Sequence, residues 1–297
     1  MCGIVGLFIK DRTLEPDLGK LLSGMLATMC DRGPDSAGFA VYGPDEAGSA
    51  KITLQSPDPS AFDGLDGALG KTLGTPVSLT VKDTHAVLRL DSACAASARA
   101  ILRETYPQLR VMAAGERIEI YKEVGYPTDV AQRFDLGGMS GTHGIGHTRM
   151  ATESAVTTMG AHPFSTGADQ CLVHNGSLSN HNNLRRELKR EGMLFETDND
   201  SEVAAAYLTA QMDKGLSLGD ALEKSLGDLD GFYTFVVGTR DGFGVLRDPI
   251  ACKPAVLAET DRYVAFGSEY RALAGLPGID TAKVWEPEPA TVYFWGR

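Results

Sequence analysis

Residues 231–267 read GFYTFVVGTRDGFGVLRDPIACKPAVLAETDRYVAFG, and this stretch indicates the fold most directly. It holds short apolar runs at 232–237, 244–246, 255–258 and 263–266. Turn residues such as glycine, proline and aspartate separate these runs. Short strands joined only by turns pair with one another in an antiparallel meander. The stretch therefore predicts an antiparallel sheet rather than alternating βαβ units.

The flanking sequence adds helices and further strands to this meander. Upstream, we expect strands at 145–148 and 171–174 and helices at about 180–191, 202–213 and 218–226. Downstream, we expect a short helix at 268–274 and closing strands near 284 and at 291–294. Near the N-terminus, an alternating strand at 3–9 precedes apolar residues at helical spacing between 14 and 29, and a second strand covers 38–42. Strands next to helices in this order predict an α+β fold of antiparallel sheets.

The region of about 43–140 has a different texture and is expected to be a small inserted α+β region. Residues 43–75 are rich in glycine, proline, aspartate and serine, which predicts a long loop with a short helix. Strands are expected at 77–81, 86–90, 109–113 and 118–121, with a helix at 93–103. No constellation of catalytic residues lies inside this region. We therefore expect one domain over 1–297, interrupted at about 43–140.

Composition excludes several classes of protein. The chain of 297 residues has a formal net charge of −11, which disfavours binding to nucleic acid or to an anionic membrane. No apolar run approaches the roughly 20 residues that a membrane helix needs. The five cysteines are odd in number and scattered, and the N-terminus does not resemble a signal peptide. We expect a reduced, cytoplasmic protein.

Cys2 is the first candidate for chemistry. Removal of Met1 would leave a residue that carries both a thiol and a free α-amine. An α-amine has a pKa of about 7.7–8.0, so part of it is neutral near pH 7 and can act as the base for its own thiol. A cysteine at position 2 can also be accidental, but Gly3 and Gly6 would let other backbone approach it closely.

Three further positions could bind a small amino acid. Arg149 can bind a carboxylate through two parallel hydrogen bonds. Asn175 and Gly176 can offer a side-chain amide and a backbone N–H to an oxyanion, and Asp200 can pair with an ammonium group. Each one alone is more simply a surface or turn residue, and Asn-Gly is a common hairpin turn. Together with Cys2 they form a complete set for an amino-acid substrate.

Other kinds of site are less well supported. His143 and His147 have the i, i+4 spacing of a metal pair on a helix, but Gly144 and Gly146 disfavour a helix there. Residues 64–72 resemble a phosphate-binding loop only with the wrong glycine spacing. Residues 198–209 lack the glycine and glutamate of a calcium loop. We expect no metal and no cofactor.

Several motifs occur in order along the chain and together resemble one family. They are CGIVG (2–6), RGPDSAG (32–38), GHTR (146–149), AHPF (161–164), HNG (174–176), DSE (200–202), RDP (247–249) and GSE (267–269). This set closely resembles the class II, or N-terminal nucleophile, glutamine amidotransferase domain. The match covers nearly the whole chain apart from about 43–140. It implies a four-layer αββα sandwich and hydrolysis of glutamine to glutamate and ammonia.

The resemblance also implies a role for each matching residue. Cys2 would attack the γ-amide carbon of glutamine, and Asn175 with Gly176 would form the oxyanion hole. Arg149, helped by Thr152, would hold the α-carboxylate. The remaining substrate-site residues would be Asp200, which binds the α-ammonium, and Arg32, which packs against the nucleophile loop. Glu153 stands where some branches place a histidine that contacts substrate.

Family members usually deliver ammonia to a synthase domain, and the chain ends just past the amidotransferase motifs. The resemblance therefore implies a separate synthase subunit that carries flavin and iron–sulfur chemistry, as in glutamate synthase or N-methylglutamate synthase, and a hetero-oligomer. The mouth of the site would face that subunit, and the insertion would be the docking surface. Two alternatives stay open. The chain could be a non-catalytic regulatory or amino-acid-binding subunit, or an N-terminal nucleophile hydrolase acting on another γ-glutamyl amide.

Overall fold

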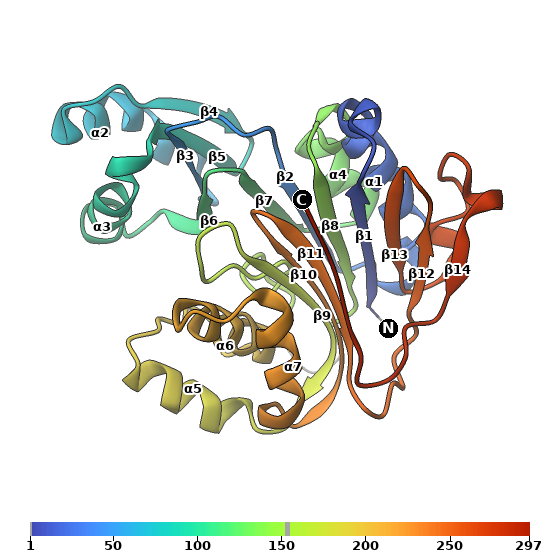
Figure 1. Cartoon of the computed structure of the whole chain (residues 1–297). Helices are drawn as coiled ribbons and strands as arrows, with labels where there is room; N and C mark the ends of the chain where they lie inside the picture. The colour runs from blue at the N-terminus through green and yellow to red at the C-terminus, as the bar shows by residue number, and fades with distance from the viewer. Residues whose placement is uncertain (1, 152–154) are drawn as a thin grey trace.

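The computed structural model describes residues 2–151 and 155–297 and is built around two facing antiparallel sheets (Figure 1). The larger has seven strands in the order β14-β12-β13-β1-β8-β2-β7, and the smaller has four in the order β15-β11-β10-β9. The strands of the larger sheet are β1 (Gly3–Ile9), β2 (Ser36–Tyr42), β7 (Ile118–Val124), β8 (His143–Arg149), β12 (Val256–Glu259), β13 (Tyr263–Gly267) and β14 (Lys283–Trp285). Those of the smaller sheet are β9 (Cys171–Leu178), β10 (Gly231–Thr239), β11 (Gly242–Arg247) and β15 (Val292–Gly296).

Helices cover the outer face of each sheet. Helices α1 (Leu18–Ala27) and α4 (Pro127–Arg133) pack on the larger sheet, and α5 (His181–Arg190), α6 (Asp200–Asp213) and α7 (Leu218–Asp228) pack on the smaller one (Figure 1). Each sheet encloses an apolar core with its helices. A further apolar core fills the space between the two sheets, with residues such as Ile4, Val173 and Val236 fully buried. The layers run helix, sheet, sheet, helix. The expected four-layer αββα sandwich is therefore confirmed.

A third sheet lies beside the sandwich. It consists of β3 (Ser49–Gln55), β4 (Ser78–Lys82), β5 (His85–Asp91) and β6 (Arg110–Gly115), with α2 (Leu65–Leu73) and α3 (Ala95–Thr105) packed on it. These elements enclose their own apolar core. The next strand, β7, belongs instead to the larger sheet, where it pairs with β2. Of the stretch expected as an insertion, residues 49–115 thus form the separate layer.

The sequence reading of 43–75 as a loop with one helix was wrong at β3. This strand pairs with both β5 and β6 and lies inside the third sheet. Its polar residues Lys51 and Thr53 are as buried as its apolar ones, and the Lys51 ammonium pairs with Glu119 at 3.0 Å. The alternation of polar and apolar residues that marks a strand is present at 49–55, but the glycine-, proline- and aspartate-rich residues on either side favoured the interpretation as a loop. Helix α4 was also missed, and the expected helix at 268–274 is only a 3-10 turn, Tyr270–Ala272.

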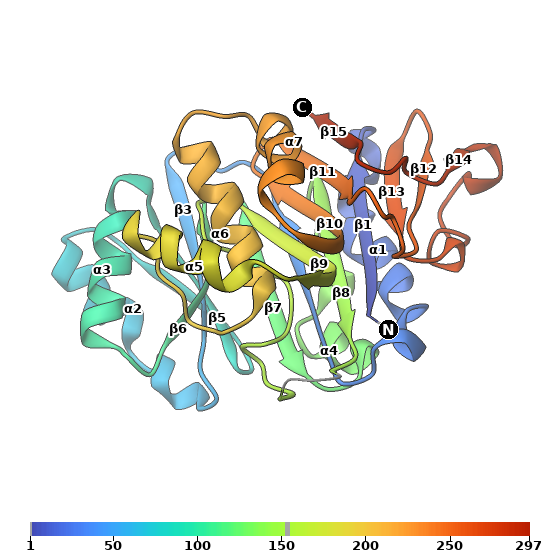
Figure 2. The same cartoon turned by 90° about the horizontal axis from the view of Figure 1, so that it is seen from below.

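None of the helices in the described ranges is both long and apolar enough to cross a bilayer. This finding concerns helical spans alone. The arrangement of the two sheets determines where the candidate site lies. It lies at the end of the sandwich where β1 begins and β8 ends (Figure 2).

Candidate active site

One cavity of about 970 Å³ collects most of the residues that the sequence singled out. Its lining includes Cys2, Arg149, Asn175, Gly176 and Asp200, which come from three strands or strand ends and one helix. Thr152 and Glu153 lie outside the described residues. Arg32 does not line the cavity but lies behind Cys2. Residues that are up to 198 positions apart in the chain thus share one site.

Cys2 lies directly before β1, and several contacts hold this end of the strand. Ile4 exchanges two hydrogen bonds with Ser268, each 2.9 Å long. The carbonyl of Cys2 accepts hydrogen bonds from Arg32 Nε at 3.0 Å and from Asn175 Nδ2 at 3.2 Å. Arg32 in turn pairs with Glu269. The RGPDSAG and GSE motifs therefore fix the backbone that carries the candidate nucleophile.

Asn175 and Gly176 lie in β9, facing β10. Gly176 has φ +153°, and a Cβ atom there would lie 2.0 Å from the carbonyl oxygen of Phe232. No side chain fits that position, so glycine is required. The Asn175 side chain is 5% exposed and reaches the backbone of Cys2. An amide nitrogen has two N–H donors, so this side chain can offer a second one to the cavity.

Arg149 ends β8 and is 6% exposed. Its backbone carbonyl accepts a hydrogen bond from Asp35 N at 3.1 Å, and the Asp35 carboxylate accepts one from Ala151 N at 2.8 Å. A Cβ atom at Gly33 would lie 2.5 Å from Arg149 N, so the loop can approach only with glycine there. The RGPDSAG loop therefore contacts both the backbone of Arg149 and, through Arg32, the carbonyl of Cys2.

Asp200 is the first residue of α6, whose N-cap is Asn199. Its Oδ2 accepts a hydrogen bond from Leu178 N at 2.9 Å, which ties the helix to the end of β9. Glu202, two residues further along α6, accepts hydrogen bonds from the amides of Glu196 and Thr197 at 2.8 Å each. A carboxylate at a helix N-terminus is stabilised by the helix dipole. The side chain of Asp200 is thus held in place at the cavity.

Sequence reasoning assigned no role to a buried histidine pair that lies behind these residues. The Ser201 hydroxyl is 2.9 Å from both His162 Nε2 and His174 Nδ1. Burial lowers the pKa of His162 well below its usual value and also lowers that of His174, so both rings are neutral near pH 7. A hydroxyl has one proton, so it donates to one ring and accepts from the other. His174 directly precedes Asn175 and Ser201 directly follows Asp200, so these hydrogen bonds connect the two candidate residues. In the sequence, the motifs AHPF (161–164) and HNG (174–176) pointed to these two histidines.

Lys253 and Phe232 also line the cavity and were missed. The Lys253 ammonium lies 5.0 Å from the centre of the Phe232 ring. Arg247 donates a hydrogen bond to the carbonyl of Lys253 at 2.9 Å, and Asp248 accepts one from the amide of Ile250 at 2.8 Å. The RDP motif thus shapes the loop that brings Lys253 to the cavity. No local pattern in the sequence marks Lys253 itself.

The arrangement has a clear chemical logic. A guanidinium and a carboxylate, Arg149 and Asp200, can bind the α-carboxylate and α-ammonium of an amino acid. A side chain of that amino acid can then reach the thiol of Cys2 beside the donors of Asn175 and Gly176. A thiol next to an oxyanion hole is suited to acyl transfer.

The comparisons with known proteins agree with this chemistry. A family model described as "Glutamine amidotransferase domain" matches residues 147–275. The glutamine amidotransferase-like protein GlxB of Rhizobium meliloti (strain 1021) is 68% identical over 296 residues, covering 99% of this chain and 98% of that protein. An amidophosphoribosyltransferase of Methanocaldococcus jannaschii is 32% identical over 181 residues, covering 60% of this chain and 38% of that protein.

The fold is also found among solved structures. The glutamine phosphoribosylpyrophosphate amidotransferase of B. subtilis, complexed with ADP and GMP, aligns with a TM-score of 0.64 at 19% identity. The alignment covers 99% of this chain and 47% of that one. The chain therefore spans about half the length of that enzyme, and the likeness concerns the fold alone.

Proposed function

The chain belongs to the class II glutamine amidotransferases, and from this premise we propose that it hydrolyses the γ-amide of glutamine with Cys2 as the nucleophile. One observation carries the proposal. A single cavity collects Cys2, Arg149, Asn175, Gly176 and Asp200, which together match every part of an amino-acid amidase. The ammonia would pass to a separate synthase subunit.

The reaction begins at the N-terminus that removal of Met1 creates. The neutral α-amine of Cys2 takes the proton of its own thiol, and the thiolate attacks the amide carbon of glutamine. The resulting oxyanion accepts hydrogen bonds from Asn175 Nδ2 and from the amide of Gly176. The intermediate then collapses, the C–N bond breaks, and the nitrogen leaves as ammonia with the proton that the amine had taken. Water hydrolyses the glutamyl thioester and regenerates Cys2.

Arg149 and Asp200 would bind the α-carboxylate and α-ammonium of the same substrate. These two charges lie away from the reacting bond and contact groups that do not change during the reaction. Interactions that are equally strong in the ground state and the transition state affect KM rather than kcat. We therefore assign substrate binding to this pair, together with Thr152.

The substitution Arg149→Lys tests this assignment. A lysine keeps the positive charge but cannot reproduce two parallel hydrogen bonds to a carboxylate. We expect KM for glutamine to rise roughly 10- to 100-fold, the equivalent of one charged hydrogen bond, with a small change in kcat. Steady-state glutaminase kinetics measure both values, and Arg12→Lys, an exposed arginine far from the cavity, is the matched control. Unchanged kinetics in Arg149→Lys would remove this residue from the site.

The substrate is tested by comparing glutamine with γ-glutamylmethylamide in the same assay. The proposed function requires a higher kcat/KM for glutamine. Preferential hydrolysis of γ-glutamylmethylamide would favour a hydrolase for another γ-glutamyl amide. No turnover of either compound by protein that begins at Cys2 would favour a regulatory subunit that only binds amino acids.

The acceptor of the ammonia is proposed to lie on another subunit, of the glutamate synthase or N-methylglutamate synthase type with flavin and iron–sulfur centres. The match to the R. meliloti relative spans 98% of that protein, whereas the M. jannaschii relative is matched along only 38% of its length. Large apolar side chains are exposed around the mouth of the cavity. Met150 and Phe232 line it and are 37% and 38% exposed, and nearby Ile250 is 68% exposed. Such a surface suits a partner protein.

We expect the substitution Ile250→Asp to weaken this complex and to lower the ammonia-dependent synthase activity, because it places a charge in an apolar contact. The subunits that co-purify from the native extract provide the complex, and glutaminase kcat is compared with and without them. Ordering of the mouth by the partner should raise kcat. Val81→Asp on the third sheet, 48% exposed, should weaken the complex as well if the inserted region is the docking surface, as the sequence predicts. A monomer that is fully active and captures no partner would refute the proposed assembly.

A further inference from the structure

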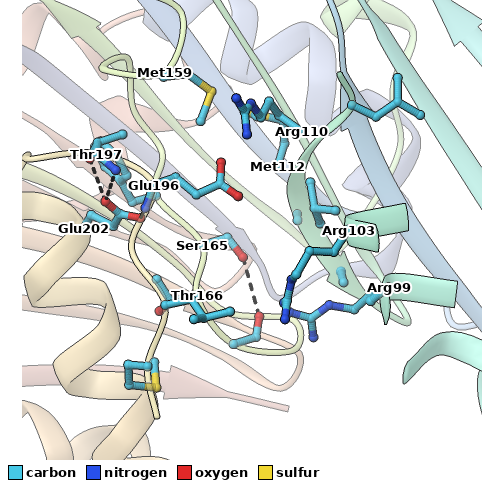
Figure 3. Close-up of a pocket in the computed structure, with 18 of the residues that line it drawn as sticks. Arg99, Arg103, Arg110, Met112, Met159, Ser165, Thr166, Glu196, Thr197 and Glu202 are labelled. Atoms are coloured by element: carbon cyan, nitrogen blue, oxygen red, sulfur yellow. Dashed lines mark hydrogen bonds between the residues drawn. The ribbon is translucent and has the colours of Figure 1, made fainter. Parts of the chain in front are cut away.

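A second cavity, of about 500 Å³, lies between the third sheet and the sandwich (Figure 3). One wall comes from α3 and the start of β6. The other comes from residues 164–167 and from the segment 192–197 that follows α5. Cavities of roughly 300–1,000 Å³ commonly hold small molecules. None of the catalytic roles proposed above uses this space.

Three arginines face the cavity from one wall. Arg99 and Arg103 are four residues apart on α3 and therefore lie on the same helix face, and Arg110 begins β6. Figure 3 shows the side chains of Arg99 and Arg103 extending from α3 into the cavity. Burial, and to a lesser degree the charge of Arg103, lowers the pKa of Arg99. Like charges at this spacing destabilise a helix unless an anion lies between them.

The described residues provide no ion-pair partner for any of the three. The acidic groups on the facing wall are Glu196 and Glu202. Glu202 is already used, because its carboxylate accepts hydrogen bonds from the amides of Glu196 and Thr197 (Figure 3). Glu196 extends toward the arginines without reaching ion-pair distance, and burial raises its pKa. Counted with Lys122, four cationic groups face the two carboxylates of Glu196 and Glu202, so the lining carries an excess of about two positive charges.

Lys122 is the remaining cationic residue of the lining. Among the described residues it is, unlike the three arginines, already bonded to protein carbonyls. Its ammonium donates to the carbonyls of Met159, Ala161 and Pro163 at 2.8–3.3 Å, and burial lowers its pKa to about 8. The rest of the cavity is mixed in character. Met112 and Phe164 are apolar, and the hydroxyls of Ser165 and Thr166 lie on the facing wall. The cavity thus offers apolar contact for a carbon skeleton next to cationic groups for its ends.

We propose that this cavity binds a small organic anion with two oxyanion groups, a dicarboxylate or a phosphate ester, through Arg99, Arg103 and Arg110. Guanidiniums bind both kinds of oxyanion through pairs of hydrogen bonds. The size of the cavity and the excess of about two positive charges in its lining set the class of ligand.

The anion site shares a wall with the glutamine site. Met159, Glu196 and Thr197 line both cavities, and the segment from Glu196 runs directly to Asp200. An anion beside the arginines would repel the Glu196 carboxylate and compete with it for the guanidiniums, and so shift this segment. We infer that occupancy changes KM for glutamine, a consequence that rests on the proposed function.

Binding is tested by isothermal titration calorimetry on the Cys2→Ala variant, which cannot turn over substrate. The probes are pyrophosphate and the dicarboxylate succinate, titrated at constant ionic strength, and the preferred probe distinguishes a phosphate from a carboxylate ligand. Each arginine replaced by glutamine should weaken binding about tenfold, so Arg99→Gln/Arg103→Gln should lose about 100-fold. Arg12→Gln should bind like the parent. Absence of binding at millimolar concentration, or equal loss in Arg12→Gln, would overturn the site.

The coupling is tested with Cys2 intact. The probe that binds is added to the glutaminase assay, where it should change KM for glutamine at least threefold and leave Arg99→Gln/Arg103→Gln unaffected. Without the probe, this double variant should have the parent's kinetics. Anion binding with no change in KM would overturn the coupling while leaving the glutaminase itself untouched. If the protein with Cys2 intact binds the probe but does not hydrolyse glutamine, the proposed function is contradicted and the anion site is not.

Discussion

Cys2→Ala is expected to reduce glutamine hydrolysis by roughly 10⁴-fold or more, the scale seen when a catalytic nucleophile is removed. Alanine has no atom that can form a thioester, and no other thiol lines the cavity among the described residues. The contacts that hold this position use the carbonyl of Cys2 rather than its sulfur, so the fold and glutamine binding should persist. Glutaminase assays and calorimetry with glutamine measure the two effects separately.

The other four cysteines serve as matched controls. Cys30 and Cys171 are buried, where burial raises the pKa of each thiol, and Cys94 and Cys252 do not line the cavity. A thiol with a raised pKa is a poor nucleophile. Replacement of any of these four by alanine should keep kcat within a few-fold of the parent. Retained activity in Cys2→Ala, or its loss in Cys252→Ala, would show that the nucleophile lies elsewhere.

Asn175→Ala should lower kcat by roughly 10²- to 10³-fold, which is typical of the loss of one oxyanion-hole donor. The amide would act on charge that develops only in the transition state, so KM should change little. Asn175→Asp has nearly the same shape but places a carboxylate beside the oxyanion, and it should be at least as inactive as Asn175→Ala.

Asn183→Ala, on the exposed surface of α5, is the control for this pair and should behave like the parent. Asn175 also contacts the backbone of Cys2 at 3.2 Å, so its loss could act through the structure of the site. Measuring kcat and KM separately distinguishes a catalytic role from a purely structural one. A defect confined to KM would argue against an oxyanion hole at Asn175.

Much of the fold could be predicted because its periodic patterns are strong. The expected strand at 3–9 is β1, and the meander expected within 231–267 consists of β10, β11, β12 and β13. The meander nonetheless crosses between layers, since β10 and β11 lie in the smaller sheet and β12 and β13 in the larger. Local patterns give the strands, but the sheet that each one joins depends on contacts that are distant in sequence. For β3, the turn-rich residues at 43–48 and 56–60 outweighed the alternation at 49–55, so even the strand was missed.

The candidate site was predictable to the extent that motifs carry it. Arg149, Asn175, Gly176 and Asp200 were named from the sequence and share one cavity with Cys2. Their catalytic and binding roles stay predictions. Ser201 and Lys253 were not foreseen, because a serine between two histidines and a lysine on a loop acquire meaning only from tertiary contacts. The arginine cavity was not predicted for the same reason, because α3 and segment 192–197 come together only in the folded chain.

The central claim is that the thiol of an N-terminal Cys2 carries the glutamyl group during turnover. The most direct test is mass spectrometry of the N-terminal peptide after the enzyme, turning over glutamine, is quenched in acid. The account predicts a peptide that begins at Cys2, without Met1, and that carries one glutamyl group on its sulfur. Protein that hydrolyses glutamine while it retains Met1, or that carries the glutamyl group on another residue, would contradict the account.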